Sequence, residues 1–504
     1  MAGTPVPHAR RQTRMITQSA RYQPGQFVLA KHPLFFCLVL ALLTRLPVAL
    51  FDNNFVAPDE IVQYIGQAHR LVYGSGPVPW EFQVGLRSWL IPGVLAGPVW
   101  LAKALGGSPH AGIVLVKVLL CFPSLSIVWC AFQWGRIYHG VRGACIAGGL
   151  AALWPDLWLM APHALEEALS AYTLVPAAYF ASRVRQAGAT RHVLAAGSLL
   201  GLSFVLREQL APAIAIIGIY LCWRNLRFWL LGVGIACVPV LLAGGLDWLT
   251  WGQPFRSFWL NIYLNAVVDV SSSTFGASPY SFYFLLLGFD WLWSSVPVLL
   301  FASRGARTLP FAALAALSIL AEHSLIPHKE FRFIFPAIAL IVPLVGLGLA
   351  ASWPRFSKSE RILSLLFLLS GPLVSPMTLL NLQMQTNAVR LYSELAQRHP
   401  CTVAVEVANG MFMPITPIFG TTDFANTPFA ANADAIVAPE DTSSIPPSFI
   451  RQNCVKQDRG PVSAEKPRIC YWIKPTGWCR EKHRPPPFEL IFPPAARRFI
   501  IDRH

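Results

Sequence analysis

Long apolar stretches recur along most of the chain, and this repetition limits the folds that it can adopt. A helix needs about 20 consecutive apolar residues to cross a bilayer. Only 13% of the 504 residues are charged, against about 25% in soluble domains. We therefore predict an all-α polytopic membrane protein with about eleven transmembrane helices, at 33–51, 112–134, 143–160, 167–182, 192–206, 209–223, 228–247, 282–302, 308–325, 333–352 and 362–380. The segment 91–105, which contains Pro and Gly, is expected to lie in the membrane plane or to be re-entrant.

The charges are arranged with a strong bias to one side of these predicted helices. The net charge of +15 suggests a nucleic-acid partner, but the Lys and Arg residues lie mostly in short loops beside apolar stretches. That arrangement is typical of cytoplasmic loops under the positive-inside rule and of contact with anionic lipid, so we reject the nucleic-acid interpretation. The predicted parts are a basic cytoplasmic tail at 1–32, a transmembrane domain at 33–384 with its first extracytoplasmic loop at 52–111, and an extracytoplasmic C-terminal domain at 385–504.

The conspicuous titratable clusters near the membrane fall on the opposite, non-cytoplasmic side. One of them, HSLIPHKEFRFIFP at His323–Pro336, is basic on the side where the charge rule disfavours basic residues. A misplaced Lys or Arg costs roughly 2.5–3.5 kcal/mol on insertion scales. His328, Lys329 and Arg332 would suit a phosphate group, and anchoring to lipid headgroups is the alternative.

The first long loop carries several polar residues close to the membrane. Asp59 and Glu60 open an amphipathic helix, which Gly74 and Gly76 end. The two carboxylates either cap this helix or present an acid at the mouth of the membrane from a helix on its surface. The other candidate substrate contacts of the loop are His69, Trp80, Glu81 and Arg87.

Two further clusters each allow two interpretations. His163, Glu166 and Glu167 share a helical face, which resembles the spacing of metal ligands but is also common in polar capping at a helix start. Arg207 and Glu208 connect two apolar stretches, where an internal ion pair is the simplest explanation and a role for Arg207 beside a phosphate is the other.

Two motifs together resemble a known enzyme family. PDE at 58–60, continued by AHRLVYGSGPVPWEFQVGLRSWLIP, and then HKEFRFIFP about 270 residues later, resemble glycosyltransferase family 22, the polyprenyl- or dolichol-phosphate-mannose-dependent α-mannosyltransferases of the GPI-anchor and N-glycan pathways. The resemblance implies a GT-C fold, an active site on the luminal or periplasmic face, a lipid-phosphate sugar donor and inversion at the anomeric carbon.

The resemblance also implies roles for individual residues. Asp59 is the expected base, with Glu60 next, and His328, Lys329 and Arg332 are expected to bind the donor phosphate, helped by Arg207. Glu330, His163 and Glu166 join the candidate substrate contacts. Side-chain cations would make a metal or other cofactor unnecessary. The expected partners are the polyprenyl-phosphate-linked sugar (with mannose as the expected sugar), a glycan or glycolipid acceptor and membrane lipid, without nucleic acid.

The C-terminal region differs in composition from the rest of the chain. TVAVEVANG and ADAIVAPE predict short strands, so we expect a small α/β domain. Its four cysteines, Cys401, Cys454, Cys470 and Cys479, predict two disulfides with three open connectivities, or else unpaired buried thiols. The sequence has no N-x-Ser/Thr site, which favours a bacterial inner membrane over the endoplasmic reticulum.

Two other functions fit the same class of membrane protein. The chain could transfer the sugar to protein or to lipid A, or it could be a transporter or flippase of lipid-linked sugars. Transporters often show internal repeats and charges at mid-membrane. We find no clear repeat, and the charges gather at one face, so transfer is favoured.

Overall fold

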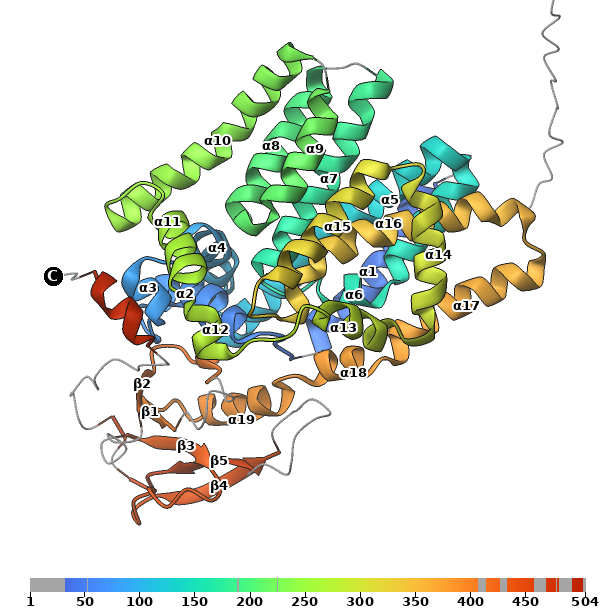
Figure 1. Cartoon of the computed structure of the whole chain (residues 1–504). Helices are drawn as coiled ribbons and strands as arrows, with labels where there is room; N and C mark the ends of the chain where they lie inside the picture. The colour runs from blue at the N-terminus through green and yellow to red at the C-terminus, as the bar shows by residue number, and fades with distance from the viewer. Residues whose placement is uncertain are drawn as a thin grey trace, which may run out of the picture.

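The computed structural model describes residues 32–51, 53–187, 190–223, 225–406, 414–426, 433–456, 468–476, 478–479 and 492–501. The basic tail expected in the cytoplasm lies almost wholly outside these residues. The chain is mostly helical, with a small sheet at its C-terminal end (Figure 1). The α-helices are α1 (Pro33–Phe51), α2 (Gly66–Tyr73), α3 (Trp80–Val84), α4 (Leu90–Ala104), α5 (Pro109–Leu153), α6 (Pro155–Leu159), α7 (Glu166–Ala187), α8 (Thr190–Leu206), α9 (Ala211–Cys222), α10 (Leu226–Trp251), α11 (Arg256–Ile262), α12 (Val270–Phe275), α13 (Phe282–Trp291), α14 (Ser295–Ala306), α15 (Pro310–Leu325), α16 (Phe335–Ser352), α17 (Lys358–Val374), α18 (Pro376–Gln383) and α19 (Thr386–Ala396).

Every apolar stretch predicted to span the membrane is helical, but the helices differ in length. Among the described residues, five helical segments are long and apolar enough to cross a membrane, or six if the pair that bends by 48° between α17 and α18 counts as one span. Other predicted spans form apolar helices of 10–17 residues, such as α8 and α15. Two predicted spans share α5, which is interrupted by non-helical backbone angles at His139 and Gly140.

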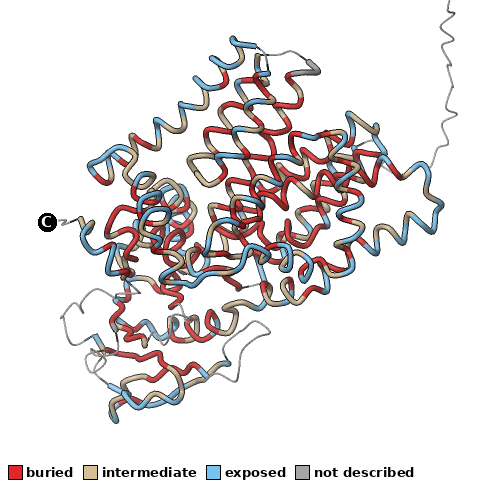
Figure 2. Tube along the Cα trace, viewed as in Figure 1, coloured by how far each residue is buried: buried red, intermediate tan, exposed pale blue. Residues whose placement is uncertain are grey.

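Helix α16 lies at the centre of the helical part, where nearly all of its residues are buried (Figure 2). It packs closely on α14 through glycines. A Cβ atom on Gly348 would lie 1.8 Å from the carbonyl oxygen of Phe301, and one on Gly305 would lie 2.0 Å from that of Leu344. Small residues at such contacts let helix backbones approach one another, which is how membrane helices associate. Helix α10, in contrast, is exposed along most of its length.

The predicted helix of the first loop forms, but its first part is buried within the protein. It begins as a π-helical turn, η2 (Glu60–Ile65), and continues as α2. Polar Glu60 and Gln63 are buried together with apolar Ile61 and Ala68, so protein covers both faces of the first part of the helix, whereas Leu71 near its end is exposed. Asp59 makes no capping hydrogen bond, so the capping interpretation is wrong for this residue.

The C-terminal part contains a five-stranded mixed sheet with the order β2-β1-β3-β5-β4. Its strands are β1 (Thr402–Val405), β2 (Asp423–Asn426), β3 (Ala435–Pro439), β4 (Ile450–Val455) and β5 (Ile469–Ile473). Strand β1 pairs in parallel with β2 and β3, whereas β5 runs antiparallel to β3 and β4. The two strands predicted from the sequence are β1 and β3. Helix α19 is joined to the sheet by Glu394, which accepts hydrogen bonds from Tyr471 and Asn453.

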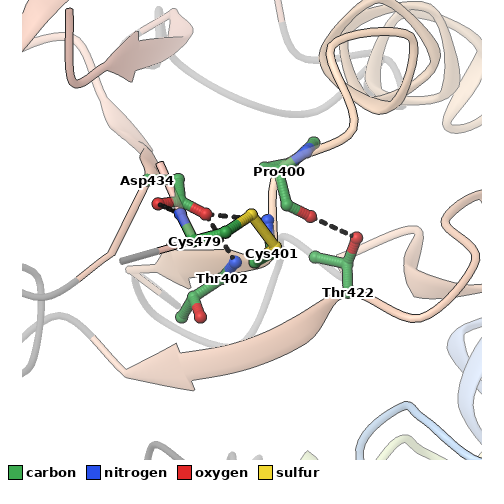
Figure 3. The surroundings of a disulfide bond; sticks show 6 residues. All are labelled: Pro400, Cys401, Thr402, Thr422, Asp434 and Cys479. Atoms are coloured by element: carbon green, nitrogen blue, oxygen red, sulfur yellow. Dashed lines mark hydrogen bonds between the residues drawn. A yellow bond between two sulfur atoms is a disulfide. The ribbon is translucent and has the colours of Figure 1, made fainter. Parts of the chain in front are cut away.

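Two disulfides hold the sheet together. Cys401 pairs with Cys479, and Cys454 pairs with Cys470 across β4 and β5. Beside the first disulfide, the buried carboxylate of Asp434 accepts hydrogen bonds from the backbone N–H groups of Cys401, Thr402 and Cys479 (Figure 3). The structure thus selects one of the three connectivities that the sequence left open.

The sheet domain also contacts the first loop. The imidazole Nε2 of His69, in the middle of α2, donates to the carbonyl oxygen of Phe419 over 2.6 Å. The hydroxyl of Ser75 donates to the carbonyl oxygen of Gly420 over 2.7 Å. Because these acceptors lie just before β2, the polypeptide of the sheet domain holds the loop that follows Asp59.

Candidate active site

Residues from distant parts of the sequence meet in one charged cluster, which we define as Asp59, Arg87, Glu166, Glu167, Arg207, Glu330 and Arg332. Its central contact joins the two sequence motifs: Arg332 Nη2 donates to Asp59 Oδ2 over 2.6 Å, across 273 residues of sequence. Arg332 Nε lies 2.8 Å from Glu330 Oε2 and 3.7 Å from Glu167 Oε1. The guanidinium therefore fixes the position of Asp59 through a charge-assisted hydrogen bond.

Arg207 forms the second centre of the cluster. Its Nη1 lies 2.9 Å from both Glu166 Oε1 and Glu167 Oε1. The expected ion pair with its neighbour Glu208 is not among the ion pairs of the described residues. Arg87 approaches Glu166 from the other side, with its Nη1 3.4 Å from Oε2, and the hydroxyl of Tyr64 donates to the same oxygen over 2.9 Å.

The predicted phosphate-binding cations all have protein partners. Arg207 and Arg332 bind carboxylates, and Lys329 Nζ donates to backbone carbonyls, including that of Ser278 at 2.9 Å. His328 Nε2 lies 3.1 Å from Glu330 Oε1. Within the cluster, three guanidinium groups face four carboxylates, so each of these cations already has a carboxylate partner. The phosphate-binding role of these residues stays a prediction.

The Glu330 carboxylate is held in its ionised form by the cations around it. Burial opposes ionisation, but the Arg332 guanidinium and the hydrogen bond from His328 hold the pKa of Glu330 well below its ordinary value. The pKa of His328 is raised in turn, chiefly by its hydrogen bond to Glu330. The turn that carries the HKEFR motif is therefore stabilised by charges of both signs.

Asp59 and Glu60 are adjacent in sequence but lie in different environments. The Asp59 side chain is 24% exposed, whereas that of Glu60 is 0% exposed and lies 2.9 Å from His163 Nδ1. The Ala164 N–H also donates to Glu60 over 3.0 Å. Burial opposes ionisation of Glu60, but its pKa is lowered because the His163 imidazole and this N–H stabilise the anion. Of the two acids, only Asp59 is open to a substrate.

The three residues whose spacing resembles that of metal ligands do not converge. His163 faces Glu60, whereas Glu166 and Glu167 face arginines. A common position for a metal ion among His163, Glu166 and Glu167 is therefore not formed in the described structure.

The remaining candidates from the first loop take different places. Trp80 packs against Phe492 in a small core between the loop and the C-terminal end, and His69 contacts the sheet domain, so neither belongs to the charged cluster. Glu81 is buried and accepts a hydrogen bond from Gln63 Nε2 over 3.0 Å. Burial raises the pKa of Glu81 to about 7, against the opposing effect of Arg87.

A cavity of about 300 Å³ adjoins the cluster. Tyr64, Arg87 and Glu166 form its wall on the side of the cluster. The rest of its lining is largely apolar and comes from the start of α4, the end of α8, α10, α11 and the segments beside these helices: Leu86, Ser88, Leu90, Ile91, Phe204, Val205, Leu206, Glu208, Val240, Ala243, Gly244, Asp247, Phe255, Ser257, Phe258, Trp259 and Asn261. A volume of this size is at the lower end of those of ligand pockets.

Sequence reasoning missed three polar residues of this cavity, Asp247, Ser257 and Asn261. One signal could have found Asp247, because it is the single acid in the apolar stretch 228–247. An ionisable residue at such a position is costly and points to a functional site.

Comparisons with known proteins indicate the family and the fold. The sequence model of the Alg9-like mannosyltransferase family matches residues 34–411. GPI mannosyltransferase 3 of Yarrowia lipolytica is 28% identical over 355 residues, which cover 66% of this chain and 65% of that protein. GPI mannosyltransferase 3 of Trypanosoma brucei brucei is 27% identical over 384 residues, which cover 64% of this chain and 66% of that protein. The chain thus spans just under two thirds of the length of these relatives.

Among solved structures, the chain is similar to ArnT from Cupriavidus metallidurans bound to undecaprenyl phosphate, with a TM-score of 0.61 and 14% identity. The match covers 88% of this chain and 98% of that one. At this identity the similarity establishes a shared fold.

Proposed function

Because the chain belongs to the Alg9-like mannosyltransferase family, we propose that it transfers mannose from a polyprenyl-phosphate-mannose donor to a glycan or glycolipid acceptor. The observation that carries this proposal is the contact between Arg332 and Asp59, which brings the HKEFR and PDE motifs into one site. The names of the similar GPI mannosyltransferases support the sugar.

Asp59 acts as the base of a single inverting displacement. An acceptor hydroxyl attacks C1 of the mannose while the Asp59 carboxylate takes its proton, and the bond between C1 and the phosphate oxygen breaks. Arg332 binds Asp59 Oδ2, and the partial exposure of the side chain leaves it open to the acceptor. A carboxylate positioned in this way contributes about 10²–10⁴-fold to the rate.

The lipid phosphate leaves as an anion and needs a cation. Arg87 is the best placed, since it lines the cavity and also belongs to the charged cluster. Arg207 and Arg332 instead hold the carboxylates in position, and the contacts of His328 and Lys329 fix the HKEFR turn. The guanidinium groups supply the positive charge, so the reaction needs no metal ion. The apolar cavity wall suits a prenyl chain, and the ArnT structure with bound undecaprenyl phosphate supports a lipid ligand in this fold.

The site faces the periplasm or the organelle lumen in this proposal, within a topology of eleven spans. The basic loops predicted on the other side support this orientation, as do the two disulfides, which form in oxidising compartments. A topology reporter inserted at His328 should be accessible from the non-cytoplasmic side, and a cytosolic signal would refute the orientation.

The substitution Asp59→Asn tests the mechanism. The amide keeps the shape and still accepts a hydrogen bond from Arg332, but it is a far weaker base. Transfer from radiolabelled polyprenyl-phosphate-mannose to a glycan acceptor should fall by about 10²–10⁴-fold, while donor binding stays within a few-fold of wild type. Asp441→Asn, at an exposed position of the sheet domain, is the matched control. Near-normal transfer by Asp59→Asn would exclude Asp59 as the base.

The same assay separates transfer from transport. In a transferase that excludes water from its site, free lipid phosphate appears only when the acceptor is present. Movement of the intact donor across a vesicle membrane, without release of lipid phosphate, would instead favour a flippase.

A further inference from the structure

The cavity contains a buried carboxylate oxygen that lacks a hydrogen-bond donor. Asp247, on the last turns of α10, is 2% exposed. Its Oδ2 accepts hydrogen bonds from the backbone N–H and the hydroxyl of Ser257, over 2.9 and 2.6 Å. Its Oδ1 is buried and has no partner within ordinary hydrogen-bond geometry, although the Ser88 hydroxyl of the same cavity wall lies close enough to interact with the carboxyl group. Leaving such an atom unpaired costs free energy that a ligand donor would recover.

A second carboxylate of the same cavity is held by amides. Glu208 Oε1 accepts a short hydrogen bond from Asn261 Nδ2, and Asn261 Oδ1 accepts one from Asn265 Nδ2 over 2.5 Å. Ser271 donates to Asn265 Oδ1 and continues the chain of hydrogen bonds. Neither Glu208 nor Asp247 takes part in any ion pair between described side chains. The hydrogen bonds that position the two acids therefore come from neutral donors.

The residues that line this part of the cavity indicate which class of ligand binds there. A phosphate directly beside these two carboxylates would be repelled, so a phosphate in this cavity is expected next to Arg87. A sugar hydroxyl suits them better than an ammonium group does, because a hydroxyl both donates and accepts and so pairs with Asp247 in either protonation state. Trp259 and Phe258 on the same lining offer apolar surface for the C–H face of a sugar ring.

We propose that Asp247 and Glu208 form a sugar-binding subsite, in which they accept hydrogen bonds from the hydroxyl groups of a pyranose ring and so determine sugar specificity. This inference rests on the proposed transferase function and deepens it. The ring belongs either to the donor or to the acceptor, since both bring hydroxyl groups to a cavity that adjoins Arg87 and Glu166.

The test uses the purified full-length protein with Asp247→Asn and with Glu208→Gln. Hydrogen bonds to a charged group are worth about 1.5–3 kcal/mol, so each variant should raise the KM of one substrate about tenfold to a hundredfold. A rise in the KM of polyprenyl-phosphate-mannose alone assigns the subsite to the donor sugar, and a rise in the KM of the glycan acceptor alone assigns it to the acceptor. Asp290→Asn changes another buried carboxyl that lies outside the cavity, and it should leave both KM values unchanged.

Binding measured without turnover gives an independent readout. In an Asp59→Asn background, a donor-sugar subsite predicts that Asp247→Asn weakens binding of polyprenyl-phosphate-mannose but not of polyprenyl phosphate that lacks the sugar. An acceptor subsite predicts weaker binding of the glycan acceptor alone.

The proposal is overturned if both folded variants keep both KM values within twofold of wild type, or if Asp247→Asn weakens the two lipids equally and leaves acceptor binding unchanged. If Asp247→Asn does not fold, Glu208→Gln tests the proposal by itself, since Glu208 lies outside the long helices. A wild-type protein that binds the sugar-bearing lipid but does not transfer mannose would refute the proposed function and leave the subsite standing.

Discussion

Glu81 provides a prediction with a defined pH window. Burial raises its pKa from 4.5 to about 7, and this difference corresponds to about 3 kcal/mol. A carboxyl group whose pKa is higher in the folded than in the unfolded state stabilises the fold below pH 4.5, and this contribution is lost as the pH rises through 7. The neutral amide of Glu81→Gln keeps the shape and can still accept the hydrogen bond from Gln63. The stability of this variant relative to wild type should therefore increase by up to about 3 kcal/mol between pH 4.5 and pH 8.

Thermal unfolding of the purified protein in detergent, measured from pH 4.5 to pH 8 on both proteins, gives this difference. Other groups such as His69, whose pKa burial lowers to about 4, titrate in both proteins and cancel. Glu440→Gln, a surface carboxylate that pairs with Arg451, is the control and should show no comparable change in this window. If the difference in stability between Glu81→Gln and wild type does not change with pH, the raised pKa of Glu81 is refuted.

Two further predictions concern the charged cluster and the sheet domain. Arg207→Met should destabilise the protein by about 3–5 kcal/mol, because it leaves the buried Glu167 with only the more distant Arg332. Adding Glu167→Met should restore most of that loss in thermal unfolding, and a double variant no more stable than the single one would contradict the pairing. Replacing Cys401 and Cys479 together by Ser should cost about 2–5 kcal/mol and speed limited proteolysis of the sheet domain. Unchanged proteolysis would show that this disulfide does not support the domain.

The sequence was a good guide to the helices and to the family, because both depend on local patterns. Apolar stretches are helical where expected, and the family indicated by the PDE and HKEFR motifs is confirmed. The number of complete spans was less predictable. The break at His139 and Gly140, which interrupts α5, falls between the predicted spans 112–134 and 143–160, but short helices such as α15 are read as full spans by composition alone.

The pairing of charges could not be predicted, since it depends on which helix ends meet in space. Arg207 binds Glu166 and Glu167, about 40 residues away, and not its neighbour Glu208. Similarly, the PDE motif does not predict which of its two acids is exposed. That depends on His163, about 100 residues away, which contacts the buried Glu60. The disulfide connectivity could not be predicted either, since the spacing of four cysteines does not distinguish among the three possible pairings.

The hydrogen bonds from His69 and Ser75 to the backbone around Phe419 have a consequence for protein engineering. A chimera that exchanged the C-terminal region between related enzymes would replace the backbone to which the first loop is tied, even though no residue of that loop had changed. Exchange of the region beginning at α19 should therefore impair turnover unless the loop is grafted with it.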